Sequence, residues 1–407
     1  MYTQQGRESN VENPSIVLNS RLPDQSWGRL HRPGWRWARA AFVRALPAVL
    51  LTATLAAVCA LLACLGPGYL ESVSRNADNS AYALIAGAIR SGHFEEIETV
   101  IRFWGLPYAV ALTSLILHVG AYPAIALISV VSILASAGLA AVLWSRRVAA
   151  YFVVTNYTFL QFGVFGGAES LFLALLLFSL WVARRGHWGW AAIVAAAATT
   201  VRPLGCLALL AYGVTLLHQR RYKSALAATL GGSAVLILYC VPLYIHFGDP
   251  LANFHGYQAT NWNHGWPITF PFGGIIANFR TRANIHGPIM LGAKVAYVAA
   301  HVTLLAGALG SRERRTRLFL RPQEGMFVCL YSAFMFLYNA PEWALSIYPR
   351  LLLAVFPMLL DVYRVRLPRS RVLVAALAFL AVFFTCGTSF GLGPLLAILG
   401  LAKLFHP

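Results

Sequence analysis

Charged residues are scarce in this chain of 407 residues: Asp, Glu, Lys and Arg make up 11% of it, while 58% is hydrophobic. A soluble domain carries roughly 25% charged residues. The longest polar stretches are the first 40 residues, 67–105 and 246–288, so no soluble catalytic domain fits between the apolar runs. The shortage of charge predicts an integral membrane protein whose function depends on loops and helix ends.

Several sequence motifs are also missing. The chain has no Gly-rich phosphate loop, nucleophile elbow or dinucleotide fingerprint, which argues against chemistry driven by ATP or NAD. The six cysteines lie in or beside apolar runs without the spacing of metal ligands, and we interpret them as small core residues. The histidines of 246–288 have no H-x-x-H or H-E-x-x-H spacing, so they predict no metal site by themselves.

Apolar stretches recur after about residue 41, many of them close to the ~20 residues that a membrane-crossing helix needs. We therefore predict an all-α, polytopic transmembrane bundle of about 11 or 12 spans, formed by residues 41–407. Leu46–Leu65 is the expected first span, because no cleavage pattern of a signal peptide follows it. Residues 1–40 are expected to form a loose, basic cytoplasmic tail.

Net charge is +18, from 32 Lys and Arg against 14 Asp and Glu. Cytoplasmic loops collect Lys and Arg near helix ends. Basic residues gather here in the N-terminal tail up to Arg44, at Arg146-Arg147, Arg184-Arg185, Arg220-Arg221 with Lys223, Arg312 to Arg321, and Arg364 to Arg371. Placing these clusters and the N-terminus in the cytoplasm makes 67–120 and 246–288 outer loops. Topology then explains most of the charge, and we predict no nucleic-acid partner.

Two regions are ambiguous, and the charges decide both. Residues 188–217 have basic flanks and Arg202-Pro203 at their centre, so we expect two short crossings that meet at Arg202. The second span is expected at Ala121–Trp144, which leaves Leu106–His118 as an additional helix that lies in the outer interface or dips into the membrane from it. Pro107 suits its first turn.

Asp78 stands near the expected bilayer edge, where an acid is costly unless it faces water or a partner. Tyr82 and Ala86 follow it at four-residue steps, so the three share one helical face and the carboxylate and phenol are expected to line one wall of a cleft. Asp is also a favoured helix N-cap. The sequence leaves both a catalytic role and a capping role open.

Glu169 and two arginines are the other unusual polar residues. Glu169, in "FGGAESLFLALLL", either meets the helix dipole in a first turn or serves as a second outer carboxylate that orients an acceptor hydroxyl or assists a metal. Arg202 and Arg350, the latter in "SIYPRLLL", have donors that match a phosphate. Both arginines also have two plainer interpretations, snorkelling to the surface or salt bridges to Asp78 or Glu169.

The outer loops contain further candidates for substrate contacts. We include Arg102, His255 and His264 in this group. The aromatic residues between 246 and 288 fit an interfacial belt or a platform on which a sugar stacks.

Taken together, these residues resemble the GT-C superfamily of integral-membrane glycosyltransferases, which includes lipid A aminoarabinose transferases and protein O-mannosyltransferases. The resemblance covers most of residues 45–365. It rests on Asp78, Tyr82, Ala86, Gly92 and Leu106-Pro107-Tyr108, on "GGAESLF", on Arg202-Pro203 with Gly205, and on "YPRLLL". The middle pieces are similar to a bacterial mannosyltransferase-like branch.

The resemblance implies a sugar donor carried on polyprenyl phosphate, mannose being favoured, and transfer with inversion to a glycan, lipid or protein acceptor at the extracytoplasmic face of a bacterial plasma membrane. Asp78 would be the general base, Tyr82 and Glu169 would orient the acceptor, and Arg202 and Arg350 would hold the phosphate leaving group.

Cofactor and alternative functions follow from the same residues. Asn79 and Ser80 stand where some relatives continue a D-x-D metal site, so no cofactor is predicted with certainty and a divalent cation is left open. The alternative function is a multi-pass transporter or a lipid-carrier flippase without transferase activity. The acids gather on one side and the halves of the chain show no repeat, which favours the enzyme over a transporter.

Overall fold

A computed structural model describes residues 35–94, 97, 102–259, 268–282, 287–339 and 344–399. His264 and the neighbouring aromatics Trp262 and Trp266 lie outside the described residues. The chain divides into two compact units, Met1–Phe42 and Val43–Pro407. Within the first unit the described residues begin at Trp35 and form the start of a helix. The site and its supports all lie in the second unit.

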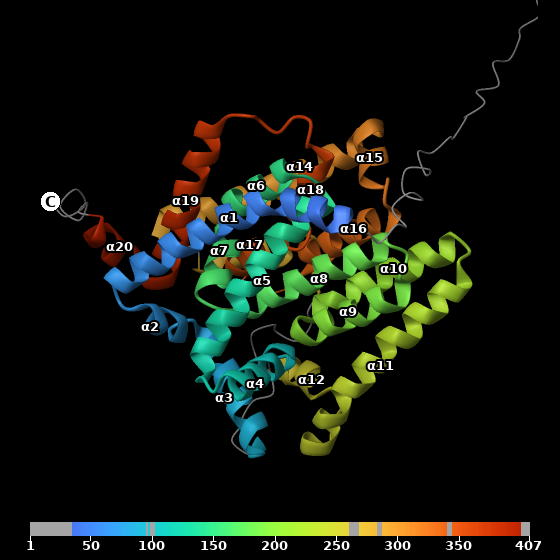
Figure 1. Ribbon diagram of the computed structural model, residues 1–407, viewed down its shortest axis with the longest axis horizontal. Helices are drawn as coiled ribbons and strands as arrows, with labels where there is room; N and C mark the ends of the chain where they lie inside the picture. Colours follow the sequence, from blue (N-terminus) through green and yellow to red (C-terminus); the bar gives the residue numbers. More distant parts are fainter. Residues whose placement is uncertain are drawn as a thin grey trace, which may run out of the picture. The chain divides into compact units, whose positions relative to one another are not determined.

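Every regular element of the described residues is a helix, apart from one isolated antiparallel bridge between Ile268 and Tyr338. In chain order (Figure 1) these are α1 (Trp35–Leu65), α2 (Tyr69–Ser74), α3 (Ala77–Ser91), α4 (Gly105–Leu117), α5 (Ala121–Leu143), α6 (Arg146–Thr155), α7 (Tyr157–Val164), α8 (Ala168–Arg184), α9 (Trp188–Val201), the 3₁₀ turn η4 (Pro203–Gly205), α10 (Cys206–His218), α11 (Tyr222–Phe247), α12 (Ala252–Ala259), α13 (Gly273–Arg282), α14 (Gly287–Gly310), α15 (Arg312–Leu318), α16 (Pro322–Leu337), α17 (Ala344–Leu352), α18 (Phe356–Val362), α19 (Arg371–Phe390) and α20 (Leu392–Ile398). The predicted all-α class is confirmed.

Five helices of the described ranges are long and apolar enough to cross a membrane, and two bent helix pairs raise this number to as many as seven. They are Ala38–Leu65, Ala121–Leu143, Tyr222–Phe247, Leu291–Gly310 and Arg371–Phe390, with the pairs α7–α8 and α17–α18. The expected multi-span bundle is confirmed. The expected count of 11 or 12 is not reached, because three apolar stretches form helices of only 10–17 residues, below the ~20 that a crossing needs.

The expected outer loops also contain more regular structure than open loops would. Residues 67–120 hold α2, α3 and α4, and 246–288 hold α12 and α13. The additional helix predicted at 106–118 is α4, which lies beside α3 (Figure 1) and also packs against α5 and α9. These short helices surround the end of the bundle where Asp78 lies.

Small residues let the helices of the bundle approach closely. The buried face of α9 is made mainly of alanines, and it packs against α8 and α11. A Cβ at Gly231 of α11 would lie 2.9 Å from the Gly189 carbonyl oxygen, so the two backbones are almost in contact. Because lipid supplies no hydrophobic drive between helices, such small-residue contacts favour association through close packing.

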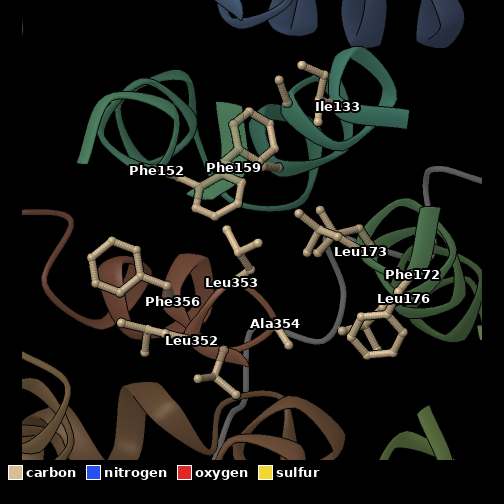
Figure 2. Packing of buried hydrophobic residues seen from close by; sticks show 14 of the residues in the cluster. Ile133, Phe152, Phe159, Phe172, Leu173, Leu176, Leu352, Leu353, Ala354 and Phe356 are labelled. Atoms are coloured by element: carbon tan, nitrogen blue, oxygen red, sulfur yellow. The ribbon is translucent and has the colours of Figure 1, made fainter. Parts of the chain in front are cut away.

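Large side chains fill the space between α5–α8 and the turn that follows α17. Figure 2 shows Phe152 and Phe159 beside Leu353, with Ile133 and Leu173 close by. The Phe152 and Phe159 rings lie 4.8 Å apart between centroids, and both residues belong to the main buried cluster. One core therefore supports both bent helix pairs, α7–α8 and α17–α18.

A sharp turn joins α7 to α8, which meet at 110°. Gly166 has a φ of 86° and Gly167 a φ of 155°, a conformation that side-chain-bearing residues rarely adopt. A Cβ at Gly166 would also lie 2.5 Å from Asn79 Nδ2. The turn places Glu169 in the first turn of α8, the position in which an acid is expected from the sequence to meet the helix dipole.

The basic clusters expected on one side of the membrane meet in the structure. Arg146 donates to the Val43 carbonyl oxygen at 2.9 Å, Arg147 to that of Leu367 at 3.5 Å, and Arg184 to that of Leu143. Hydrogen bonds from these arginines therefore join segments that are far apart in the sequence. This grouping agrees with the pattern from which we predicted a common side.

Candidate active site

Asp78 lies in the first turn of α3, but it does not cap the helix. The cap is Asn76, whose side-chain oxygen accepts a hydrogen bond from the Asp78 N–H at 3.4 Å. Of the two roles that the sequence left open, capping therefore belongs to Asn76. The Asp78 carboxylate is left to form ion pairs with residues distant in the sequence.

Two carboxylates and three guanidinium groups meet around Asp78. Asp78 Oδ1 lies 2.7 Å from Arg102 Nη2, and Asp78 Oδ2 lies 2.7 Å from Arg350 Nη2. Glu169 Oε1 accepts from Arg350 Nε at 2.6 Å and also from Arg202. We call these residues the five-residue ionic site: Asp78, Arg102, Glu169, Arg202 and Arg350. The structure thus brings together the three residues predicted for base and phosphate roles, Asp78, Arg202 and Arg350. Glu169, predicted to orient the acceptor, and Arg102, predicted to contact substrate, join them.

The five-residue ionic site holds one more guanidinium group than carboxylates. The side chains are only partly accessible, with Glu169 7% and Arg350 22% exposed. Charges interact more strongly where water is partly excluded. The surplus positive charge makes this a site that favours an additional anion.

The surrounding arginines control the charge state of Asp78. Burial alone raises the pKa of this carboxyl group, but the positive charges of Arg350, Arg102 and Arg202 outweigh it and hold the pKa well below its usual range. Asp78 is therefore a carboxylate at neutral pH and ready to accept a proton. While both of its oxygens face guanidinium groups, it is a weak base.

Glu169 uses its two oxygens differently. Oε1 faces both Arg202 and Arg350, whereas Oε2 is buried and makes no hydrogen bond within the described structure. A Cβ at Gly167 would lie 2.8 Å from Oε2, so a larger residue at 167 would crowd this oxygen. Buried polar atoms are almost always hydrogen-bonded, and Oε2 is thus an acceptor that lacks its donor.

The position of Arg350 is set by the packing of α17 against α7. Thr158 Oγ1 lies 3.0 Å from the Pro349 carbonyl oxygen and 2.6 Å from Asn156 Oδ1, and its single proton is shared between these two acceptors. The Arg350 guanidinium also lies over the Phe162 ring, 4.4 Å from its centroid, at a distance suited to a cation–π contact. Contacts with α7 therefore fix both the backbone next to Arg350 and the Arg350 side chain.

Arg202 lies at the break between two short apolar helices, as predicted. It has an extended backbone after α9, and η4 follows it before α10 begins. A Cβ at Gly205 would lie 2.5 Å from the Thr199 backbone nitrogen, so the chain doubles back closely here. The break directs the Arg202 guanidinium to Glu169.

Arg102 is held through its backbone by α11 and α12. Asn253 Nδ2 donates to the Arg102 carbonyl oxygen at 2.7 Å. Tyr239 OH in turn donates to Asn253 Oδ1 at 2.6 Å and accepts from the Trp104 N–H at 3.1 Å. The sequence identified Arg102 as a candidate for substrate contact, but it gave no sign that this residue pairs with Asp78.

Two asparagines beside Asp78 were not predicted to matter. Asn79 Nδ2 donates to the Phe165 and Val73 carbonyl oxygens, both at 2.8 Å, and Asn76 Nδ2 donates to that of Gly166 at 2.8 Å. They tie the start of α3 to the glycine turn that precedes Glu169. The signal in the sequence is "NADN", two amides flanking an acid at a helix start.

The other predicted residues lie elsewhere. Tyr82 is buried in the main core together with Ala86, so the helical face that they share with Asp78 points into the protein; an acceptor-orienting role for Tyr82 stays a prediction. His255 pairs with Asp249, Nδ1 to Oδ2 at 2.6 Å, on an exposed surface. His264 lies outside the described residues.

The arrangement does not suit a metal ion. Within the described ranges no three His, Cys, Asp or Glu side chains gather as a metal site. The two carboxylates of the five-residue ionic site are already paired with guanidinium groups, which would repel a cation. We therefore assign no step to a metal.

Comparisons with known proteins agree with the all-helical membrane architecture. No protein-family model and no curated protein matches the chain. Its structure is similar to a solved structure, ArnT from Cupriavidus metallidurans bound to undecaprenyl phosphate, with a TM-score of 0.51 and 14% sequence identity. The similarity covers 88% of this chain and 77% of that one.

At this identity the likeness shows the fold alone. The chain is an integral, multi-span membrane protein with a fold of the GT-C type. The expected fold is confirmed, while the narrower mannosyltransferase-like branch is not. The chemistry has to be inferred from the residues of the site.

Proposed function

We propose that this protein is a membrane glycosyltransferase that moves a sugar from a polyprenyl-phosphate-linked donor to an acceptor at the extracytoplasmic face of a bacterial plasma membrane. One observation carries the proposal: the five-residue ionic site pairs a carboxylate with a surplus of guanidinium groups at the breaks of apolar helices. The GT-C type fold supports it, since ArnT, with a similar structure, was solved with undecaprenyl phosphate bound.

The donor phosphate would bind to Arg350 and Arg202, with Arg102 beside them. Guanidinium groups offer fixed donors that match phosphate oxygens. A donor of this kind is a phosphodiester with one negative charge, which balances the surplus positive charge of the site. The prenyl chain supplies membrane affinity at roughly 0.8 kcal/mol per buried methylene, so no nucleotide-binding fold is needed.

Donor binding would also activate Asp78. When the phosphate draws Arg350 away from Asp78 Oδ2, the carboxylate loses a stabilising positive charge and its pKa rises toward the ordinary range. Asp78 then takes the proton of the acceptor hydroxyl. The low pKa in the unliganded protein and the role of base are therefore compatible.

The reaction balances as a single displacement. The deprotonating acceptor oxygen bonds to the anomeric carbon of the sugar while the bond from that carbon to the phosphate oxygen breaks. Attack from the face opposite the phosphate inverts the configuration. The electron pair stays on the phosphate, which becomes a polyprenyl phosphate with a second negative charge, and the three guanidinium groups stabilise this charge as it develops. Mannose is the sugar that we propose.

The test is transfer of radiolabelled sugar from polyprenyl phosphate donors, with mannose first, in membranes that contain the wild type or Asp78→Asn. Loss of a general base typically lowers the rate about 10²- to 10⁴-fold, and we expect a loss of this size. Asp249→Asn is the matched control, because that exposed acid lies outside the site. Equal turnover in the wild type and Asp78→Asn would remove Asp78 from the role of base.

The same assay separates the transferase from a lipid-carrier flippase. A flippase would move labelled donor between the leaflets of a vesicle without forming a glycosylated product. Transport of the donor without any transfer in the wild type would refute the transferase.

A further inference from the structure

Lys294 is a buried cation in a membrane span. It lies on α14, within the apolar segment Leu291–Gly310, and is 6% exposed. Its ammonium group donates to Ser346 Oγ at 2.8 Å. Among the described residues no carboxylate lies within ion-pair distance of Lys294. The chemistry of the five-residue ionic site does not use it.

A structural role does not explain the charge. The same helix is joined to its neighbours by neutral groups: Tyr297 OH donates to the Thr155 carbonyl oxygen at 2.7 Å, and His301 Nδ1 lies 2.7 Å from Tyr348 OH. These contacts hold α14 against α6 and α17 without an uncompensated charge. Ionisable groups inside membrane spans are costly and usually mark a functional site.

Lys294 lies close to the five-residue ionic site along α17. Its partner Ser346 precedes Arg350 by four residues on that helix, so the two side chains share one face with Cβ atoms about 5–6 Å apart. Lys294 itself is seven residues from the start of α14, about 10 Å along the helix axis.

We propose that Lys294 and Ser346 form a second anion subsite, which binds a phosphoryl group of a substrate one helical turn from the group held by Arg350. The ammonium group supplies the charge. The Ser346 hydroxyl accepts from Lys294 and keeps its own proton to donate to a phosphate oxygen. The subsite rests on the proposed function for the identity of the neighbouring group. The phosphoryl group belongs either to a diphosphate-linked donor or to a separate molecule.

The test measures binding to the purified full chain in lipid nanodiscs by titration calorimetry. The probes are undecaprenyl monophosphate, undecaprenyl diphosphate, and inorganic phosphate added alone or after the monophosphate. Lys294→Met removes the charge at similar length. Losing one partner of a buried charge pair weakens binding by at least about tenfold.

If the group belongs to the donor, the wild type prefers the diphosphate, and Lys294→Met weakens diphosphate binding at least about tenfold while monophosphate binding changes less than about twofold. If it belongs to a separate molecule, inorganic phosphate binds the wild type, also alongside the monophosphate, and Lys294→Met abolishes this. A wild type without a diphosphate preference and without phosphate binding overturns the subsite. Failure of both lipids to bind refutes the proposed function instead, and the inorganic phosphate arm still tests Lys294.

Two further measurements separate the subsite from a structural link. Removing an uncompensated buried charge leaves the thermal stability of the unliganded protein equal or higher, whereas loss of a structural link lowers it. Ser346→Ala keeps the charge and should weaken the same binding by a smaller factor. Arg75→Met, which removes an exposed cation paired with Glu71, is the control and should leave every binding ratio unchanged.

Discussion

The two ends of α8 carry two ionic groups of the same composition and different character. Glu169 in the first turn belongs to the five-residue ionic site, and Arg184 at the last residue belongs to a second group, about 22 Å away at 1.5 Å per residue. We call the second group the ionic clamp: Arg184, Arg321, Glu324, Asp361 and Arg364. Each group holds three arginines and two acids.

The ionic clamp is closed by direct hydrogen bonds at Glu324 and its surplus charge is hydrated, while Asp361 Oδ1 makes no hydrogen bond within the described structure. Arg184 binds Glu324 through two parallel hydrogen bonds of 2.5 and 2.8 Å, and Trp144 Nε1 donates to the same carboxylate at 3.1 Å. Arg364 is 51% exposed, so water solvates it. These residues lie at the ends of regular helices, and the geometry is that of a structural joint.

The surplus charge of the five-residue ionic site is less hydrated than that of the clamp. Glu169 Oε2 has no hydrogen bond in the described structure, and none of the three arginines is more than 22% exposed. Its residues come from a helix start, a coil, a glycine turn and a helix break. Each group contains one buried carboxylate oxygen without a hydrogen bond, so neither charge composition nor an unsatisfied acceptor identifies a site; the poorly solvated surplus charge distinguishes the five-residue ionic site from the clamp.

The largest expected effect on stability belongs to the ionic clamp. Glu324→Gln leaves Arg184 without its buried counter-ion, and we expect a loss of about 3–5 kcal/mol in the free energy of unfolding. Thermal unfolding in nanodiscs measures this. Undecaprenyl phosphate binding per folded molecule should not change, and a selective loss of binding would show that the clamp is part of the site.

The largest expected effect on binding belongs to Arg350. Arg350→Met should weaken undecaprenyl phosphate binding by about 2–5 kcal/mol, because a desolvated charge contact is lost. Arg350→Lys should restore it only in part, since a lysine cannot reproduce the planar fork. Calorimetric titration measures both, and binding of Arg350→Met at wild-type strength would place the phosphate elsewhere.

A smaller effect is expected from the asparagines. Asn79→Leu removes two hydrogen bonds to carbonyl oxygens of Val73 and Phe165, and each buried acceptor left unsatisfied costs about 1–3 kcal/mol. Asn76→Ala, which loses one contact to the turn and the weak 3.4 Å cap bond to the Asp78 N–H, is the comparison. Transfer rate should fall along with stability, because the glycine turn positions Glu169. If Asn79→Leu is less stable but keeps the wild-type transfer rate, Asn79 contributes to folding stability and does not position Glu169 for the reaction.

The smallest effect is the pH dependence of Asp78. Its pKa is lower in the folded protein than in the unfolded chain, where it is about 3.9. The ionised group therefore contributes stability that is fully present above that value and is lost as the pH falls toward the folded pKa. The stability difference between the wild type and Asp78→Asn should stay constant from neutral pH down to about 5 and shrink below about 4. A difference that shrinks already near neutral pH would contradict the low pKa.

All five members of the five-residue ionic site were candidates from the sequence. Glu169, Arg202 and Arg350 interrupt apolar runs where charge is costly, Asp78 stands near the expected bilayer edge, and Arg102 lies in an expected outer loop. Salt bridges of Arg202 and Arg350 to Asp78 or Glu169 were one of three interpretations, and the structure contains them. The sequence could not select this one, because Asp78 and Arg350 are 272 positions apart and no periodicity encodes such a contact.

The roles of the supporting residues were hidden for a similar reason. Asn76 and Asn79 donate hydrogen bonds to backbone carbonyl oxygens. Because every residue has such an oxygen, the sequence does not indicate which one each asparagine binds. The described residues hold five to seven candidate spans and not 11 or 12, because hydropathy shows that a segment is apolar, while breaks such as that at Arg202 decide how long each helix becomes.

The most direct test of the account compares Asp78→Asn with Asp361→Asn in one transfer assay with a polyprenyl phosphate sugar donor. Both variants remove an acid that faces two arginines. We predict that Asp78→Asn loses about 10²- to 10⁴-fold in transfer rate per folded molecule and that Asp361→Asn keeps the wild-type rate. Equal rates in the two variants would contradict the assignment of chemistry to the five-residue ionic site.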